Sequence, residues 1–219
     1  MAIKPILFNT EMVRAILDGR KTCTRRLVKF LPGENSQWTG YIKDGLMLYN
    51  GRNEPCIRKV PYQPGDIMYV RETWQYLYEL DGNEQIIEGT GKYYYAATDT
   101  IPFDTYVDAS GVTHERVPWH PSIHMPKEAA RIWLKVTDVR VERLQEITEE
   151  CAKKEGAIDN RGFIHSPDNE YDSVHTAREH FAEIWDSTIK KSDLDRYGWN
   201  ANPWVWVIEF ERCEKPEGV

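Results

Sequence analysis

Helical periodicity marks three segments of the chain. Apolar residues recur at helical spacing over residues 172–189, which form the clearest helix in the sequence. A second helix is predicted over residues 10–18, where four apolar side chains share one face and Gly19 follows at a position typical of a helix end. Thr148, which is followed by two glutamates, predicts the start of a third helix over residues 149–155.

Strand-like segments outnumber the helical ones. Residues 99–125 show no sustained period, and we expect them to form a long ordered loop. Because strands dominate and helices interrupt them irregularly, the pattern favours a mixed α+β domain with a curved or barrel-like sheet. The predicted strands cover residues 3–8, 27–30, 67–74, 132–141 and 204–210, and the predicted hairpins cover residues 41–49, turning at Asp44 and Gly45, and residues 85–98, turning at Gly89 to Gly91.

Length and charge limit the possible classes of protein. The 219 residues suffice for one substantial domain, which we assign to residues 1–219 with a frayed tail at 214–219. The formal net charge of −7 argues against a protein coated in phosphate contacts, but it allows a local basic patch for one nucleotide or a short strand. Eight Trp and twelve Tyr favour an aromatic core, with a pocket that stacks on a flat ligand as the alternative.

The cysteines and the hydropathy bear on location. The four cysteines lack the spacing of a zinc site, and a reduced, intracellular compartment accounts for them most simply. No apolar run approaches the roughly 18 residues of a membrane span. We therefore expect a cytoplasmic protein with no membrane partner, no metal and no cofactor.

Residues 19–26 concentrate basic and reactive side chains. Their sequence, Gly-Arg-Lys-Thr-Cys-Thr-Arg-Arg, holds four basic groups and three hydroxyl or thiol groups. The segment lies between a predicted helix and an apolar run, which is a common place for function. A charge run of this kind is more often simply solvated, so the segment by itself does not establish a site.

The same eight residues resemble the Gly-x-Lys-x-x-Thr-x-Arg signature of the ASCH domains, a branch of the PUA-like superfamily. Three weaker matches follow in the family's order: the strand start at 64–66, the helix at 144–156 and the closing strand at 207–210. The whole is similar to a longer form carried by phages and prophages, in which insertions at about 32–62, 76–125 and 157–200 extend a core of roughly 100 residues.

This resemblance implies a small β-barrel with flanking helices and a cleft for RNA, nucleosides or related ligands. One bacterial branch of the family is an amidohydrolase that removes the acetyl group from N4-acetylcytidine, and it is credited with a Lys, a Thr and a Glu. These three fall on Lys21, Thr24 and Glu155 here. For a phage-encoded protein, the location would be the host cytoplasm.

Amide hydrolysis sets geometric conditions on those residues. A Thr hydroxyl is a poor nucleophile, and a nearby Lys amine can take its proton only if burial or neighbouring cations lower the lysine pKa. Glu155 would orient the lysine, hold a water or protonate the leaving amine. Residues three apart on a strand point to opposite faces, so Lys21 must lie in the turn after Gly19 to meet Thr24.

Several interpretations remain open. The leading one is recognition of RNA or a modified nucleoside, with amidohydrolase activity as its enzymatic form. The others are a non-catalytic binding module, a metal-independent ribonuclease and a phage-encoded protein that binds a host partner through residues 99–125. Glu155 on a helix surface and a structural ion pair between Arg71 and Glu72 are the simpler alternatives, and the oligomeric state stays open. The candidate ligand-binding residues are Arg20, Arg25, Arg26, Arg71, Glu72 and Trp74.

Overall fold

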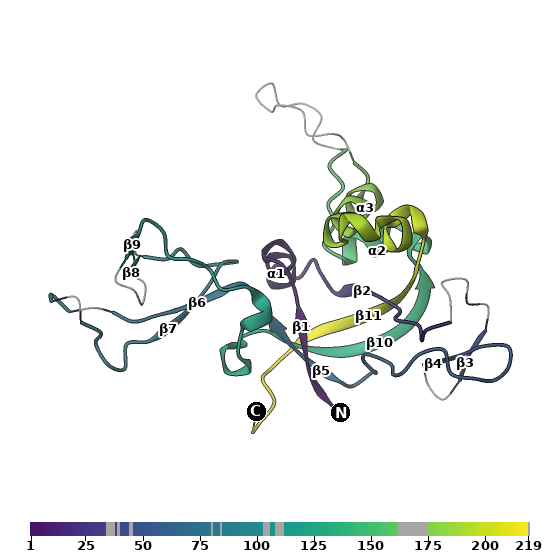
Figure 1. Ribbon diagram of the computed structural model, residues 1–219, viewed down its shortest axis with the longest axis horizontal. Helices are drawn as coiled ribbons and strands as arrows, with labels where there is room; N and C mark the ends of the chain where they lie inside the picture. Colours follow the sequence, from purple (N-terminus) through teal and green to yellow (C-terminus); the bar gives the residue numbers. More distant parts are fainter. Residues whose placement is uncertain are drawn as a thin grey trace. The chain divides into compact units, whose positions relative to one another are not determined.

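The computed structural model describes residues 1–33, 38, 40–43, 46–79, 81–83, 85–102, 106–107, 112–161 and 175–218 (Figure 1). The fold is mixed α+β. Five strands form one mixed sheet in the order β1-β5-β10-β11-β2, and three further sheets have two strands each. Within these residues, no helix is both long and apolar enough to cross a membrane.

The regular elements follow one another along the chain. The strands are β1 (Ile3–Leu7), β2 (Cys23–Leu27), β3 (Tyr41–Lys43), β4 (Met47–Tyr49), β5 (Ile67–Arg71), β6 (Trp74–Leu77), β7 (Lys92–Tyr95), β8 (Tyr106–Val107), β9 (Thr113–His114), β10 (Trp133–Arg143) and β11 (Trp204–Cys213). The α-helices are α1 (Thr10–Leu17), α2 (Glu149–Lys154), α3 (Ala177–Thr188) and α4 (Leu194–Tyr197). The 3-10 helices are η1 (Ser122–His124), η2 (Lys127–Ala129), η3 (Leu144–Glu146), η5 (Lys191–Asp193) and η6 (Trp199–Ala201).

The chain divides into two compact units. Unit 1 consists of Met1–Ala2, Asp18–Asp66 and Lys135–Glu211. Unit 2 consists of Ile3–Leu17, Ile67–Leu134 and Arg212–Val219. The assignment of residues 1–219 to one domain stays a prediction.

Unit 1 is built on the antiparallel pair of β2 and β11. Thr24 lies opposite Ile208, and Arg26 lies opposite Trp206. Because side chains alternate along a strand, the intervening residues face the other way, toward α2 and α3. Figure 1 shows these two helices side by side. They share a core with the two strands that comprises Cys23, Leu144, Ile147, Ala152, Ala157, Ala177, Phe181, Trp185, Val205 and Val207.

Unit 2 has its own core. β1 runs parallel to β5, and α1 lies between them in the chain. β6 and β7 form an antiparallel pair in which Trp74 lies opposite Tyr95. The core residues are Ile67, Tyr69, Met125, Ala129, Ala130 and Trp133.

Several sequence predictions are confirmed. The helix predicted over residues 10–18 is α1, and Gly19 follows it with a φ of +76°. Thr148 caps α2, since its side chain accepts a hydrogen bond from the Cys151 N–H at 3.1 Å. The strands of the hairpin at 41–49 pair as β3 and β4, while its turn residues 44 and 45 lie outside the described residues.

Other boundaries were wrong. The strand predicted over 67–74 ends at Arg71, because the Glu72 N–H leaves the ladder and donates to the Met125 sulfur at 3.1 Å. The hairpin predicted over 85–98 does not form, because β7 pairs with β6 instead. Gly91 directly precedes β7, and a Cβ there would lie only 2.1 Å from the Tyr76 hydroxyl of β6, so a larger residue would displace the Tyr76 side chain.

Three further segments differ from the predictions. The first strand after the basic motif begins inside it, at Cys23, and not at residue 27. The helix predicted over 172–189 covers Ala177–Thr188, where the side chains of Thr176 and Glu179 form a capping box; residues 172–174 lie outside the described residues. The predicted loop at 99–125 contains β8, β9 and η1.

Candidate functional site

A tight turn at Gly19 connects α1 to β2 and contains the first residues of the basic motif, residues 19–26. Gly19 takes the left-handed conformation after α1, which favours glycine. Both backbone polar groups of Thr22 are hydrogen-bonded. Its N–H donates to the Lys154 carbonyl, and its carbonyl accepts from the Phe210 N–H, each at 2.9 Å. Since β2 starts at Cys23, Lys21 lies ahead of the regular strand, as the predicted meeting with Thr24 requires, but its amine contacts Glu155 while Thr24 contacts Arg26.

Lys21 and Glu155 form a buried ion pair. Glu155 is the C-terminal cap of α2, and the two residues are only 2% and 5% exposed. The Lys21 Nζ donates to Glu155 Oε2 at 2.7 Å, to the Glu155 carbonyl at 2.8 Å and to the Cys23 carbonyl at 2.8 Å. Three acceptors match the three protons of an ammonium group, so this geometry holds the charged form of the lysine.

Arg25 is a second cation on the same carboxylate. Its Nη1 donates to Glu155 Oε1 at 3.1 Å, and its Nη2 donates to Glu142 Oε2 at 3.2 Å. The guanidinium lies 5.8 Å from the centre of the Phe181 ring, and its Nε is buried without a hydrogen-bond partner among the described residues. Glu155 therefore compensates two buried positive charges at once.

Burial also shifts the pKa values of this cluster. Desolvation lowers the pKa of Lys21 from its ordinary value, while the charge of Glu155 opposes the shift. Desolvation raises the pKa of the Cys23 thiol to about 12, and the charge of Glu155 adds to that shift. The thiol is therefore neutral near pH 7 and is not a ready nucleophile.

Thr24 and Arg26 lie on the opposite face of β2 from Cys23 and Arg25. Thr24 is 1% exposed, and its hydroxyl accepts a hydrogen bond from Arg26 Nη1 at 2.6 Å. The same Nη1 donates to the Arg25 carbonyl at 2.9 Å. Lys21, Arg25 and Glu155 thus meet on one side of the strand start, and Thr24 meets Arg26 on the other.

Arg26 also forms part of the wall of a cavity of about 540 Å³. The Leu31 N–H donates to the Cys56 carbonyl at 2.8 Å, which holds the loop after residue 56 against the end of β2. Four cations and the Trp206 indole contribute to the lining, and the described lining residues include no Asp or Glu. The residues of this Arg26 cavity are Arg26, Leu27, Lys29, Phe30, Leu31, Pro32, Ile57, Arg58, Lys59, Pro61 and Trp206.

The remaining sequence candidates lie elsewhere. Arg20 is exposed and pairs with Asp18 at 3.1 Å. In unit 2, the Arg71 Nη1 donates to the Ile123 carbonyl at 3.1 Å. Glu72 is buried and accepts two hydrogen bonds from Arg131, each at 2.9 Å. The Trp74 ring lies 5.8 Å from the Tyr93 ring and 5.1 Å from the His120 ring.

Sequence reasoning missed part of the cavity wall. Lys29, Arg58 and Lys59 were not singled out. The adjacent Arg58 and Lys59 in a loop were the available signal, but nothing in the sequence places that loop beside β2. Comparison of the chain with protein-family models, curated proteins and solved structures finds no match.

Proposed function

We propose that this protein is a PUA-like domain of the ASCH type that recognises RNA or a modified nucleoside in the Arg26 cavity. The observation that supports it is the lining of that cavity. In a chain of net charge −7, four cations gather there with no carboxylate among the described lining residues. Such a local excess of positive charge attracts phosphate. The half-buried Phe30 ring in the same lining offers a base a surface for stacking, while Trp206, only 3% exposed, forms the wall behind it.

The buried cluster of Lys21, Arg25 and Glu155 fixes the strand that contributes Arg26 to the cavity wall. Glu155 ties the end of α2 to Lys21 and Arg25, and this fixes the start of β2. The alternation of the strand then directs Thr24 and Arg26 toward the cavity side. In this proposal Lys21, Arg25 and Glu155 position the strand, while Arg26, Lys29 and Arg58 contact the ligand.

Direct binding measurements test the recognition of RNA. Fluorescence anisotropy of a labelled short RNA would compare the wild type with the double variant Arg58→Ala/Lys59→Ala at two salt concentrations. Loss of two phosphate contacts should weaken binding for every sequence and reduce the salt slope by about 2. The matched control is Lys190→Ala/Lys191→Ala, which removes the same charge from an exposed pair outside the cavity. Equal losses in the two variants, or no binding by the wild type, would contradict the proposal.

A second candidate is hydrolysis of an N4-acylated cytidine. It is favoured by the direct contact of Lys21 and Glu155, at 2.7 Å, beside the strand that carries Thr24. The Thr24 oxygen would attack the acyl carbon and expel the cytosine N4, which takes up the hydroxyl proton. Lys21 could carry that proton only if the start of β2 rearranged, because Lys21 and Thr24 lie on opposite faces of the strand. Water would then release the carboxylic acid from the acyl-threonine. Arg26 would have to move off the Thr24 hydroxyl to admit the substrate, and Lys21 would have to lose a proton first.

Product analysis tests this reaction. The protein would be incubated with N4-acetylcytidine in the presence of a chelator, and released cytidine would be followed by chromatography. Lys21→Ala and Thr24→Val should abolish release, and Thr24→Ser should retain part of it. Short RNA run in parallel tests the metal-independent ribonuclease. An inactive wild type would refute the hydrolase activity without contradicting the proposed binding of RNA or a nucleoside.

A further inference from the structure

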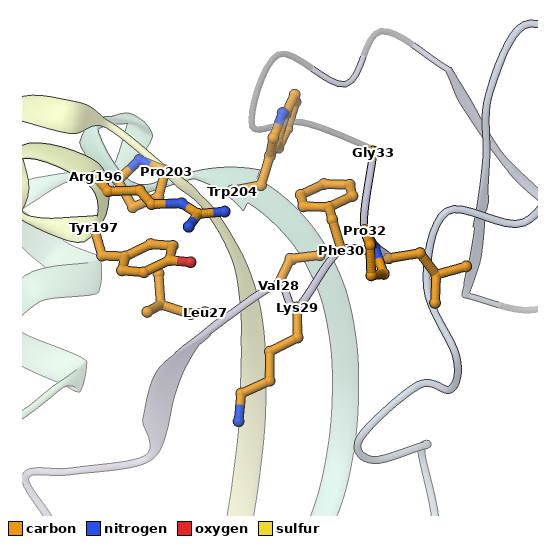
Figure 2. A pocket seen from close by; sticks show the side chains of 11 residues that line it. Leu27, Val28, Lys29, Phe30, Pro32, Gly33, Arg196, Tyr197, Pro203 and Trp204 are labelled. Carbon is orange, nitrogen blue, oxygen red and sulfur yellow. The ribbon is translucent and has the colours of Figure 1, made fainter. Parts of the chain in front are cut away.

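A second cavity, of about 420 Å³, adjoins the first (Figure 2). It combines the end of β2 and the segment after it with α4 and the start of β11. Figure 2 shows the side chains of Arg196 and Tyr197 extending from α4 toward the segment that carries Phe30. The residues of this Tyr197 cavity are Leu27, Val28, Lys29, Phe30, Leu31, Pro32, Gly33, Arg196, Tyr197, Pro203 and Trp204.

The Tyr197 cavity has the same chemistry as the Arg26 cavity. Three aromatic side chains, those of Phe30, Tyr197 and Trp204, line it together with two cations, Lys29 and Arg196. Its described lining residues also include no Asp or Glu. Aromatic surfaces beside uncompensated cations suit a flat anionic ligand such as a nucleotide.

The walls of the Tyr197 cavity are held by contacts behind them. The Tyr197 carbonyl accepts a hydrogen bond from Trp185 Nε1 at 2.9 Å, which ties α4 to α3. The guanidinium of Arg143 lies 4.4 Å from the centre of the Trp204 ring and so supports the indole. These contacts preorganise the aromatic surfaces, which reduces the entropy lost when a ligand binds.

The two cavities share one wall. Lys29 and Phe30 line both of them, together with Leu27, Leu31 and Pro32. Trp204 and Trp206 contribute one indole to each cavity. Trp206 is only 3% exposed and therefore supports the wall from within. The half-buried Phe30 ring is the aromatic surface that lines both cavities.

Four cations along this surface lie apart from the carboxylates of the described residues. Lys29, Arg58, Lys59 and Arg196 are all exposed, and none of them forms an ion pair within the described part of the chain. The buried cations Lys21 and Arg25, in contrast, are paired with carboxylates. Unpaired positive charge on one surface of an acidic protein is typical of a binding site for a polyanion.

We propose that the Arg26 and Tyr197 cavities are consecutive subsites for one single-stranded polynucleotide. One base occupies each cavity, and Lys29 contacts the phosphate that links them. This inference rests on the proposed recognition of nucleic-acid-derived ligands, and it names their class: a strand of at least two nucleotides and not a free nucleoside.

Competition experiments distinguish the two ligand classes. A labelled short RNA would be displaced by cytidine monophosphate and by the corresponding dinucleotide. Stacking of a second base contributes about 1–3 kcal/mol, so the dinucleotide should compete about 5- to 150-fold better. Tyr197→Leu and Arg196→Gln should each reduce this advantage without changing competition by the monophosphate. Tyr41→Leu, at an exposed tyrosine outside both cavities, is the matched control.

Each outcome decides between the two proposals. Equal competition by the two ligands, or equal weakening of both by Tyr197→Leu, would overturn the paired subsites while the recognition of a nucleotide stands. Failure of the wild type to bind the RNA or either competitor would overturn both. Arg196→Gln changes an exposed side chain and should fold, so this variant still tests the paired subsites if Tyr197→Leu does not fold. Ribo- and deoxyribodinucleotides run side by side assign the strand to RNA, to DNA or to either.

Discussion

Replacement of Glu155 by glutamine should destabilise the protein strongly. The substitution keeps the size of the side chain but removes the negative charge that Lys21 contacts at 2.7 Å and Arg25 at 3.1 Å. Both cations remain buried, and Arg25 also contacts the carboxylate of Glu142. A buried charge without compensation is costly because the protein interior does not solvate it.

The expected magnitude follows from this geometry. Removal of one partner from a buried ion pair costs about 3–5 kcal/mol of unfolding free energy. For a chain of this size, each kcal/mol lowers the melting temperature by about 2–4 °C, so Glu155→Gln should lower it by roughly 6–20 °C. The double variant Lys21→Met/Glu155→Leu removes both members of this pair but still leaves Arg25 without Glu155, so it should recover only the part of the loss that comes from Lys21.

Urea and thermal unfolding followed by circular dichroism measure these differences. The control is Glu150→Gln, which makes the same change at an exposed position of the same helix and should cost less than about 0.5 kcal/mol. A loss below about 1 kcal/mol in Glu155→Gln would refute the compensation of two buried cations by this carboxylate.

Three further predictions concern pH, a second ion pair and one turn. Burial raises the pKa of the Cys23 thiol from 9.0 to about 12. The stability that the retained proton provides is therefore complete below about pH 9 and declines toward pH 12. In urea unfolding midpoints measured between about pH 8 and 11, Cys23→Ala should flatten this decline. Glu72→Gln should cost about 1–3 kcal/mol in thermal unfolding because it removes the bidentate partner of Arg131, and an unchanged melting temperature would contradict this role. Gly19→Ala should cost about 1 kcal/mol because of its φ of +76°, whereas Gly51→Ala should be neutral; equal melting temperatures would show that the turn tolerates a Cβ.

Local features of the fold could be predicted from the sequence. The helix α1 followed from apolar periodicity, and its end followed from Gly19. The start of α2 followed from Thr148, whose side chain caps the helix. The strand β10 followed from its hydrophobic pattern. These features depend on neighbours within a few residues, and the sequence displays those neighbours directly.

Strand pairing could not be predicted in the same way. The turn residues at 89–91 resemble a hairpin, yet β7 pairs with β6, which lies about fifteen residues earlier. Whether two strands pair depends on which surfaces they bury together, and this is decided by contacts between distant segments. The end of β5 at Arg71 has the same origin, because Glu72 turns toward Met125 and Arg131.

The candidate site also combines local features that the sequence predicts with contacts that only the tertiary structure creates. By itself, the sequence determined that residues 19–26 hold the reactive side chains and that Lys21 precedes a strand, because a glycine turn and strand alternation are local properties. Only the tertiary structure decided that Glu155 compensates both Lys21 and Arg25, and that Thr24 faces Arg26. It also decided that Lys29, Arg58 and Trp206 share a cavity wall. Burial and electrostatic compensation depend on what surrounds a charge, and in this protein those surroundings come from segments more than a hundred residues away.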